Sequence, residues 1–262
     1  MKRLVAFAAA VAVAALVVAT TASGITNGQF DGNQHPNVGA FLWDGNHDGV
    51  RTQLCTGSLI APRVFLTASH CTEFADRFQS DVWVTFDPTD VEDNPTGVIH
   101  GTTVTNPLYN ARQLYAHDVS IILLDSAAAV TPVTIAPVGL LSTMKADRSI
   151  RSTLFTNVGY GTHEQIVVPG SGPDWPWTGD REFSISSFNA LDPKFIHLSQ
   201  NLAQGWGGTG YGDSGGPTFI DTASGPVQIS TVSTGDVPLY ATSVNTRLDT
   251  SEAHDFLAPF LP

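Results

Sequence analysis

The stretch Tyr211-Gly212-Asp213-Ser214-Gly215-Gly216-Pro217 places a serine within a run of small residues. Glycine on both sides permits backbone dihedrals that other residues avoid, and it leaves room for a substrate to approach the hydroxyl group. A sharp turn here would aim the backbone N–H groups of Gly212 and Ser214 at one point, as an oxyanion hole requires. A serine hydroxyl is a weak nucleophile by itself, so this interpretation demands a histidine base and an acid that orients it.

Two upstream segments supply these groups. His70 lies in the run Leu66-Thr67-Ala68-Ser69-His70-Cys71, and the pKa of a histidine near neutrality suits a general base. Asp118 precedes the apolar run Val119 to Leu124, which is typical of a strand buried on both faces. A carboxylate at the edge of such a strand can hold His70 in the correct tautomer. Adjacent residues of a strand point to opposite faces, so we interpret His117 as a surface or packing residue.

These three segments resemble the histidine, aspartate and serine motifs of the chymotrypsin/trypsin family of serine proteases, and they follow the family's order. The resemblance extends from about Ile25 to the C-terminus. It implies an all-β fold of two packed antiparallel β-barrels with a short C-terminal helix. It also implies a catalytic triad of His70, Asp118 and Ser214, oxyanion donors on Gly212 and Ser214, and no requirement for a cofactor.

The two cysteines, Cys55 and Cys71, both lie near the proposed base. Cys55-Thr56-Gly57-Ser58-Leu59-Ile60 resembles a strand of the family, and the family has a disulfide bond between the same two positions. An exported chain meets oxidising conditions that favour such a bond. Two free buried thiols are the alternative that the residues alone leave open.

The first residues have the pattern of a secretion signal. Lys2 and Arg3 precede the apolar run Leu4 to Val18, and small residues follow up to Gly24. The apolar run is short for a membrane anchor. We therefore expect residues 1–24 to be a signal peptide and the protein to be secreted, with no membrane contact after its removal. The Ala-rich leader suits a bacterial source.

The length allows one large or two small domains, and the hydrophobic content is ample for a buried core. The 262 residues are 42% hydrophobic and 14% charged, with frequent Gly and Pro, as in a loop-rich β protein. The leader holds two of the 12 basic residues and none of the 24 acidic ones, so the remaining chain has a net charge of −14. Such acidity disfavours nucleic acid and anionic membranes. We expect a monomer that acts on protein or peptide substrates.

The expected domain is residues 25–262, with an N-terminal barrel over about 25–130 and a C-terminal barrel over about 138–262. The segment 127–137 is rich in Ala, Val, Thr and Pro, which is typical of a link between two halves. Near the end of the chain, Asp249-Thr250-Ser251-Glu252 predicts a helix start with Asp or Ser as the cap. Apolar residues then recur at helical spacing and predict one buried face: Ala253, Phe256, Leu257 and Phe260.

Ile25-Thr26-Asn27-Gly28 resembles the mature N-terminus of the family, Ile-Val-Gly-Gly, with departures at Thr26 and Asn27. In that family the freed α-amino group pairs with the aspartate before the nucleophile, which implies an ion pair between Ile25 and Asp213. An unpaired buried carboxylate is costly, so Asp213 is expected to have this structural task and not to orient the base. Ala22-Ser23-Gly24 has the small residues of a signal-peptidase site, and we hypothesise that signal removal itself exposes Ile25.

The resemblance also indicates which residues form the specificity pocket. Gly208, six residues before Ser214, occupies the position of the pocket floor, where trypsin-type members have aspartate. Ser233, Gly235 and Leu239 are expected to line the walls. These residue types predict a pocket for small or medium apolar side chains. Asp236 argues against this preference if the short loop turns inward, because its carboxylate would then attract a basic side chain.

Carboxylates are dense between Asp87 and Asp93, which suits calcium. Some family members bind calcium in a loop at about this distance past the histidine, but the spacing matches no EF-hand loop. We favour a solvated acidic turn at this place and expect no metal.

Two other functions remain to be weighed. Gly212, Ser214 and Gly216 also fit the nucleophile elbow of α/β-hydrolases, with Asp236 or Asp249 and then His254 downstream. That fold needs a helix after the nucleophile, whereas the residues after Pro217 are typical of a strand and a turn. A non-catalytic binding protein on a chymotrypsin-like scaffold is the second alternative. The altered N-terminal segment favours it, as does Gly210, which stands where the family usually has a pocket-bracing cysteine.

Overall fold

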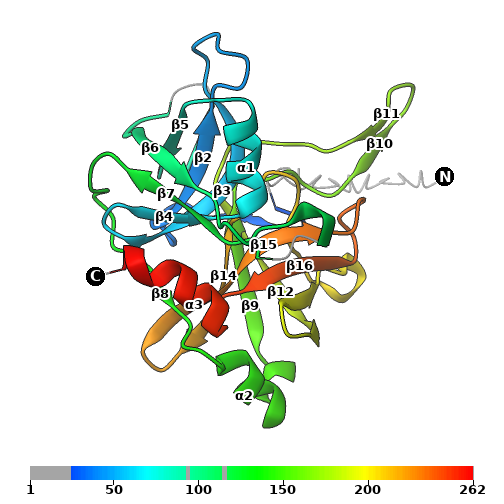
Figure 1. The fold of residues 1–262 in the computed structure, drawn as a ribbon. Helices are drawn as coiled ribbons and strands as arrows, with labels where there is room; N and C mark the ends of the chain where they lie inside the picture. Colours follow the sequence, from blue (N-terminus) through cyan, green and yellow to red (C-terminus); the bar gives the residue numbers. More distant parts are fainter. Residues whose placement is uncertain (1–24, 93–94, 114–116, 262) are drawn as a thin grey trace, which may run out of the picture.

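The computed structural model describes residues 25–92, 95–113 and 117–261. The predicted signal peptide, residues 1–24, lies outside these ranges. Two β-barrels pack against each other, and short helices lie on their outer surfaces (Figure 1). Within the described ranges, no helix combines the length and the hydrophobicity that crossing a membrane would take.

The first barrel is closed by six antiparallel strands in the order β2-β3-β4-β7-β6-β5. Its inward-facing apolar side chains include Phe41, Leu59, Phe65, Val84 and Ile122, and they form one buried cluster. The alternation of apolar and other residues along each strand provides this inner face. The strands are β2 (Val38–Trp43), β3 (Thr52–Ala61), β4 (Val64–Thr67), β5 (Val82–Thr85), β6 (Ile99–Val104) and β7 (Ser120–Leu124).

The second barrel follows the order β9-β12-β13-β16-β15-β14, and β9 closes it by pairing with both β12 and β14. A second buried cluster fills it, with Phe155, Ile196, Leu198, Ile220 and Ile229 among its members. The strands are β9 (Leu154–Gly159), β12 (Glu182–Leu191), β13 (Phe195–Ser199), β14 (Pro217–Thr222), β15 (Gly225–Gly235) and β16 (Thr242–Arg247).

Four shorter strands lie outside the two barrels. β1 (Gln29–Phe30) pairs with β12 of the second barrel, although it precedes the first barrel in sequence. β8 (Thr134–Ile135) pairs in parallel with β15. β10 (Ile166–Val168) and β11 (Gly172–Asp174) form a separate hairpin that projects from the side of the molecule (Figure 1).

Three α-helices accompany the barrels: α1 (Ser69–Arg77), α2 (Leu140–Ala146) and α3 (Ser251–Leu257), the last continued by a 3₁₀ turn over Ala258–Phe260. The expected C-terminal helix is therefore present, and its apolar face packs against the first barrel. The expected cap was wrong, because the Thr250 side chain accepts the hydrogen bond from the Ala253 N–H group. Asp249 instead pairs with Arg247, at 2.8 Å from its Nε atom.

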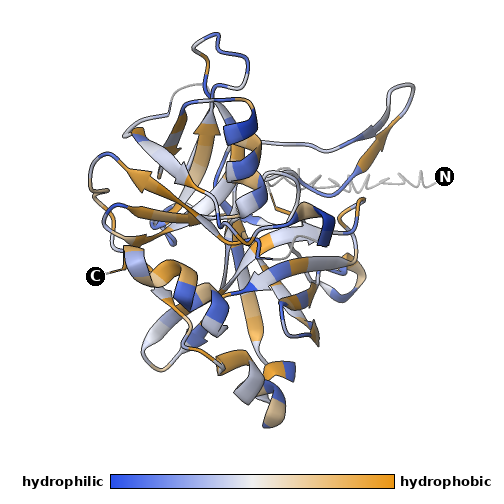
Figure 2. Cartoon of the chain, viewed as in Figure 1, coloured by the Kyte–Doolittle hydropathy of each residue, from blue (hydrophilic) through white to orange (hydrophobic). Residues whose placement is uncertain are grey.

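A further buried cluster joins the two barrels. Val38, Ala40 and Leu42 of β2 meet Val158 from β9 and Phe219 from β14. Figure 2 shows that β7 in the first barrel is largely hydrophobic along its length. The predicted all-β architecture of two packed antiparallel barrels with a short C-terminal helix is confirmed.

Candidate active site

Asp118 and His70 are hydrogen-bonded across two elements of the first barrel. Asp118 is fully buried two residues before β7, and its Oδ2 atom lies 2.8 Å from His70 Nδ1. Its Oδ1 atom accepts from the His70 backbone N–H group at 2.8 Å, so the carboxylate also caps the first turn of α1. The Ser233 hydroxyl donates to Oδ2 at 2.5 Å. Three donors thus compensate the buried carboxylate and fix the histidine ring.

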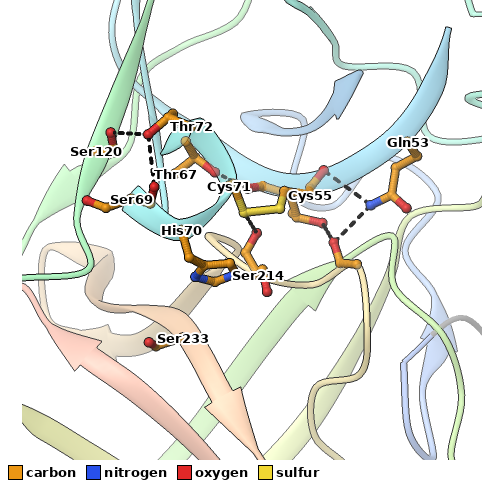
Figure 3. The surroundings of a disulfide bond; sticks show 12 residues. Gln53, Cys55, Thr67, Ser69, His70, Cys71, Thr72, Ser120, Ser214 and Ser233 are labelled. Atoms are coloured by element: carbon orange, nitrogen blue, oxygen red, sulfur yellow. Dashed lines mark hydrogen bonds between the residues drawn. A yellow bond between two sulfur atoms is a disulfide. The ribbon is translucent and has the colours of Figure 1, made fainter. Parts of the chain in front are cut away.

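The disulfide bond lies directly behind this histidine. Cys71, the residue after His70, is bonded to Cys55 of β3, and their Cα atoms are 6.4 Å apart (Figure 3). The predicted pairing is confirmed. The bond closes a loop of 16 residues and ties the start of α1 to β3. The neighbouring His117 is turned to the other side, where its ring meets Glu252 of α3.

Ser214 lies in the loop before β14 and lines the same cleft as His70. Its carbonyl group accepts from the Thr56 N–H group at 2.9 Å, which anchors the loop to β3. Gly215 follows with a φ of +80°. A Cβ atom there would lie 2.2 Å from Thr67 Oγ1, so this position requires glycine both for its backbone conformation and for close packing.

The peptide unit that carries the Ser214 N–H group is fixed through its carbonyl group. Asp213 O accepts from the Gly216 N–H group at 2.8 Å. In a trans peptide the C=O and N–H bonds point in opposite directions. The Ser214 N–H group is therefore turned away from Gly216, and within the described part of the chain it has no acceptor.

The peptide units on both sides of Gly212 are also fixed through hydrogen bonds to their carbonyl groups. Tyr211 O accepts from the Thr162 N–H group at 2.7 Å, which directs the Gly212 N–H group the opposite way. Gly212 O accepts from Gln53 Nε2 at 2.8 Å and from Thr56 Oγ1 at 2.9 Å. The Gly212 N–H group also has no acceptor among the residues that the structure describes. The positive φ of +93° at Gly212 is what this arrangement requires.

Gln53, Thr56 and Thr162 were not identified from the sequence. Gln53 is separated from Gly212 by 159 residues, and no motif marks its role. Thr56 lies beside Cys55 in a segment that resembles the family, which was the one available signal.

The cleft beside Ser214 has a volume of about 360 Å³. Three of the expected pocket residues line it, namely Ser233, Gly235 and Leu239, and Val232 and Thr209 add to its walls. Gly208 is not among the lining residues. It is buried behind them, and a Cβ atom there would lie 2.1 Å from Gln200 Oε1.

Asp236 also borders the cleft, but backbone donors already occupy its carboxylate. The N–H groups of Tyr240 and Ala241 donate to it at 2.9 and 3.0 Å, and that of Thr242 donates at 2.6 Å. These bonds fold the loop after β15 around the Asp236 side chain. These three bonds commit the Asp236 oxygens to their own loop and leave fewer of their lone pairs to bind a basic substrate side chain.

Ile25 is fully buried. In the continuous chain its N–H group donates to Glu182 Oε2 at 3.3 Å, and Asp213 instead accepts from the N–H groups of Gly161 and Gly210, at 2.8 and 2.7 Å. Burial, together with the negative charge of Glu182, raises the pKa of the Asp213 carboxyl to about 8. The ion pair between Ile25 and Asp213 requires a freed amino group and stays a prediction.

The acidic segment after β5 uses its carboxylates in local hydrogen bonds. Asp87 accepts from the Thr96 hydroxyl at 2.7 Å, and Glu92 accepts from the Gln53 N–H group at 2.9 Å. Asp93 lies outside the described residues. The one metal-type cluster found within the described ranges is Cys55, His70 and Cys71, whose two sulfur atoms are committed to the disulfide bond.

No curated protein matches the chain with significant sequence similarity. The family model described as Trypsin matches residues 25–249. This range covers both barrels, the disulfide bond and all the residues of the cleft. The chain belongs to the trypsin family of serine proteases.

Proposed function

We propose that this chain is a secreted serine endopeptidase that cleaves peptide bonds through an acyl-enzyme. One observation carries the proposal: Asp118 fixes the ring of His70, which shares a cleft with Ser214 and with two N–H groups that have no acceptor among the described residues. A hydroxyl group, an oriented base and two open donors are the parts that acyl transfer requires.

In the proposed reaction, Ser214 Oγ attacks the scissile carbonyl carbon while His70 Nε2 takes the hydroxyl proton. The N–H groups of Gly212 and Ser214 stabilise the oxyanion. His70 then gives its proton to the leaving amine, which departs and leaves an ester on Ser214. Water attacks this ester with His70 again as the base, and the acid product leaves. Asp118 stabilises the imidazolium that forms in both halves of the reaction.

The cleft supports a preference for uncharged substrate side chains of small or medium size. Its apolar walls come from Val232 and Leu239, and its polar groups are the hydroxyls of Thr209 and Ser233. Thr209 Oγ1 is bonded to Ser243 Oγ at 2.7 Å, so its hydroxyl already has a partner. A charged side chain would lose its hydration here, and Asp236, which borders the cleft, is already bonded to its own loop.

The proposed maturation is removal of residues 1–24 by signal peptidase, which makes Ile25 the first residue. N-terminal sequencing of the exported protein tests this step directly. Ile25 should be the first residue, and a start at any earlier residue would defeat the hypothesis that signal removal alone exposes it.

The function is tested by Ser214→Ala in a peptidase assay with an unfolded protein as substrate. The variant should keep the fold and lose activity by at least about 10⁴-fold, because catalysis without the nucleophile relies on the oxyanion hole and binding alone. Ser224→Ala, on the exposed β14–β15 turn, is the matched control and should retain full activity. Equal activity of Ser214→Ala and the control would refute the assignment. An inactive wild-type protein that still binds peptides would favour the non-catalytic scaffold.

A further inference from the structure

We propose that Glu182 is a second acceptor for the α-amino group of Ile25, so that two carboxylates, Glu182 and Asp213, hold the new N-terminus. The inference rests on the proposed maturation at Ile25. It assigns to Glu182 a positioning role for the active site, since Glu182 is not among the described residues that line the cleft.

The Ile25 nitrogen lies beside the carboxylate of Glu182. This nitrogen lies 3.3 Å from Glu182 Oε2, and Glu182 is only 3% exposed. Ile25 O accepts from the Gly28 N–H group at 2.8 Å, which folds the segment into a tight turn over Glu182. A Cβ atom on Gly28 would lie 2.9 Å from Glu182 Oε2. Because Gly28 has no side chain, the Glu182 carboxylate has room beside the Ile25 nitrogen.

Glu182 and Asp213 lie on the same part of the second barrel. Glu182 in β12 is paired with Gly159 in β9. A Cβ atom on Gly159 would lie 2.0 Å from Asp213 Oδ1, so the Asp213 carboxylate rests against this strand. Asp213 is fully buried, and the charge of Glu182 disfavours its ionisation. The two carboxylates therefore repel each other when both are ionised, and a cation between them would stabilise the ionised form of each.

Other charged side chains of the neighbouring segments, around Arg181 and Asp31, are already paired. Arg181, the neighbour of Glu182 in β12, is fully buried, and its Nε atom lies 2.8 Å from Asp31. Its Nη1 atom donates to the carbonyl groups of Val38 and Phe86. His35 lies 2.5 Å from the same Asp31 carboxylate. A freed α-ammonium group at Ile25 brings one positive charge and three donors to a position beside Glu182.

The pocket is connected to the active site through the next residues. Thr26 forms an isolated β-bridge with Gly208, whose N–H group donates to Thr26 O at 3.1 Å. Gly208 begins the segment that leads to Gly212 and Ser214. Asp213 is the residue between the two oxyanion donors. Fixing the N-terminus on Glu182 and Asp213 therefore braces both ends of the oxyanion segment.

The test is the alkaline limb of kcat/KM in protein that begins at Ile25. Activity should fall as pH rises through the pKa of the α-ammonium group, and each neighbouring carboxylate raises that pKa. Glu182→Gln should move the alkaline midpoint down by about one pH unit, since removing an opposite charge at this distance shifts a pKa by about that amount. Glu73→Gln, at a partly exposed residue of α1 paired with Arg77, is the control and should leave the midpoint unchanged.

The rate at which acetic anhydride modifies the Ile25 amine gives a second readout that needs no catalysis. At pH 8, Glu182→Gln should react about tenfold faster than wild type, because more of its amine is deprotonated. If Glu182→Gln does not fold, Glu182→Asp replaces it and should shift both readouts in the same direction by less. Unchanged midpoint and amine reactivity in the folded variant would overturn the role of Glu182. An inactive wild type with a protected amine would instead count against the proposed function alone.

Discussion

Asp118 is the residue on which the geometry of the candidate site most depends. It accepts from both the ring and the backbone of His70, and from Ser233. Asp118→Asn should lower kcat by about 10⁴-fold at neutral pH, because an amide donor facing Nδ1 favours the wrong tautomer of the imidazole. Steady-state kinetics with a peptide substrate measure the effect, with thermal unfolding to show that the variant is folded. A loss of tenfold or less would mean that Asp118 does not orient His70.

The state of Asp236 decides the expected substrate preference. Its carboxylate accepts from three backbone N–H groups of its own loop, so fewer of its lone pairs can bind a basic substrate side chain. Peptides with alanine, valine or leucine before the scissile bond should be cleaved at least about a hundredfold faster than those with lysine or arginine, since burying an unpaired charge costs several kcal/mol. Values of kcat/KM across a matched peptide series measure the preference. Faster cleavage after lysine or arginine would contradict the assignment of an uncharged pocket.

At the scale of elements, the disulfide bond fixes the start of α1 to β3. A bond that closes a loop of 16 residues contributes about 3 kcal/mol on the chain-entropy model. The double variant Cys55→Ala/Cys71→Ala should therefore lower the free energy of unfolding by about that amount, as measured by denaturant titration. Wild-type protein treated with a reductant should show a similar loss. Unchanged stability in both would show that the bond constrains neither the unfolded chain nor α1.

The elements also show what sequence reasoning can and cannot provide. The strands after Cys55 and Asp118 were predictable because their apolar runs and neighbouring motifs are local. Helix α2 (Leu140–Ala146) was not, because Val138 to Leu141 looks like the start of a strand in an all-β chain. The pairing of β1 with β12 joins residues more than 150 positions apart, and no local pattern records it.

The same limit applies to the candidate site. His70, Asp118 and Ser214 stand in recognisable segments, so their types and order could be read directly. Gln53 and Glu182 act through single long-range contacts, with Gly212 O and the Ile25 nitrogen. Those contacts exist only once the two barrels have closed. Gly208 was placed by its spacing from the nucleophile, whereas it does not line the cleft and packs against Gln200.

At the scale of the whole molecule, the charge state of Asp213 predicts a stability difference before and after maturation. In the continuous chain the pKa of Asp213 is raised to about 8 from its ordinary value of 3.8. The folded state then binds this proton more tightly than the unfolded state, so the contribution of Asp213 to stability is greatest below pH 4 and falls as pH rises to about 8. The loss has an upper limit of about 1.4 kcal/mol per pH unit.

The effect of the free α-amino group on Asp213 is measured by comparing two forms of the protein. One form keeps residues before Ile25, and the other begins at Ile25. Each form is compared with its own Asp213→Asn variant by denaturant titration at pH 5 and pH 8. The extended form should lose stability between these pH values relative to its variant. The form that begins at Ile25 should lose less, because its α-ammonium group stabilises the ionised carboxylate. Equal pH dependence in both forms would show that the N-terminus does not reach Asp213.

The most direct test of the central claim is labelling of the exported protein with a fluorophosphonate probe, followed by peptide mapping. The probe reacts with a serine hydroxyl that a base has activated. We predict modification at Ser214 alone, and its loss in His70→Ala. No label at Ser214, in folded protein that begins at Ile25, would contradict the account and leave a protease fold without an active nucleophile.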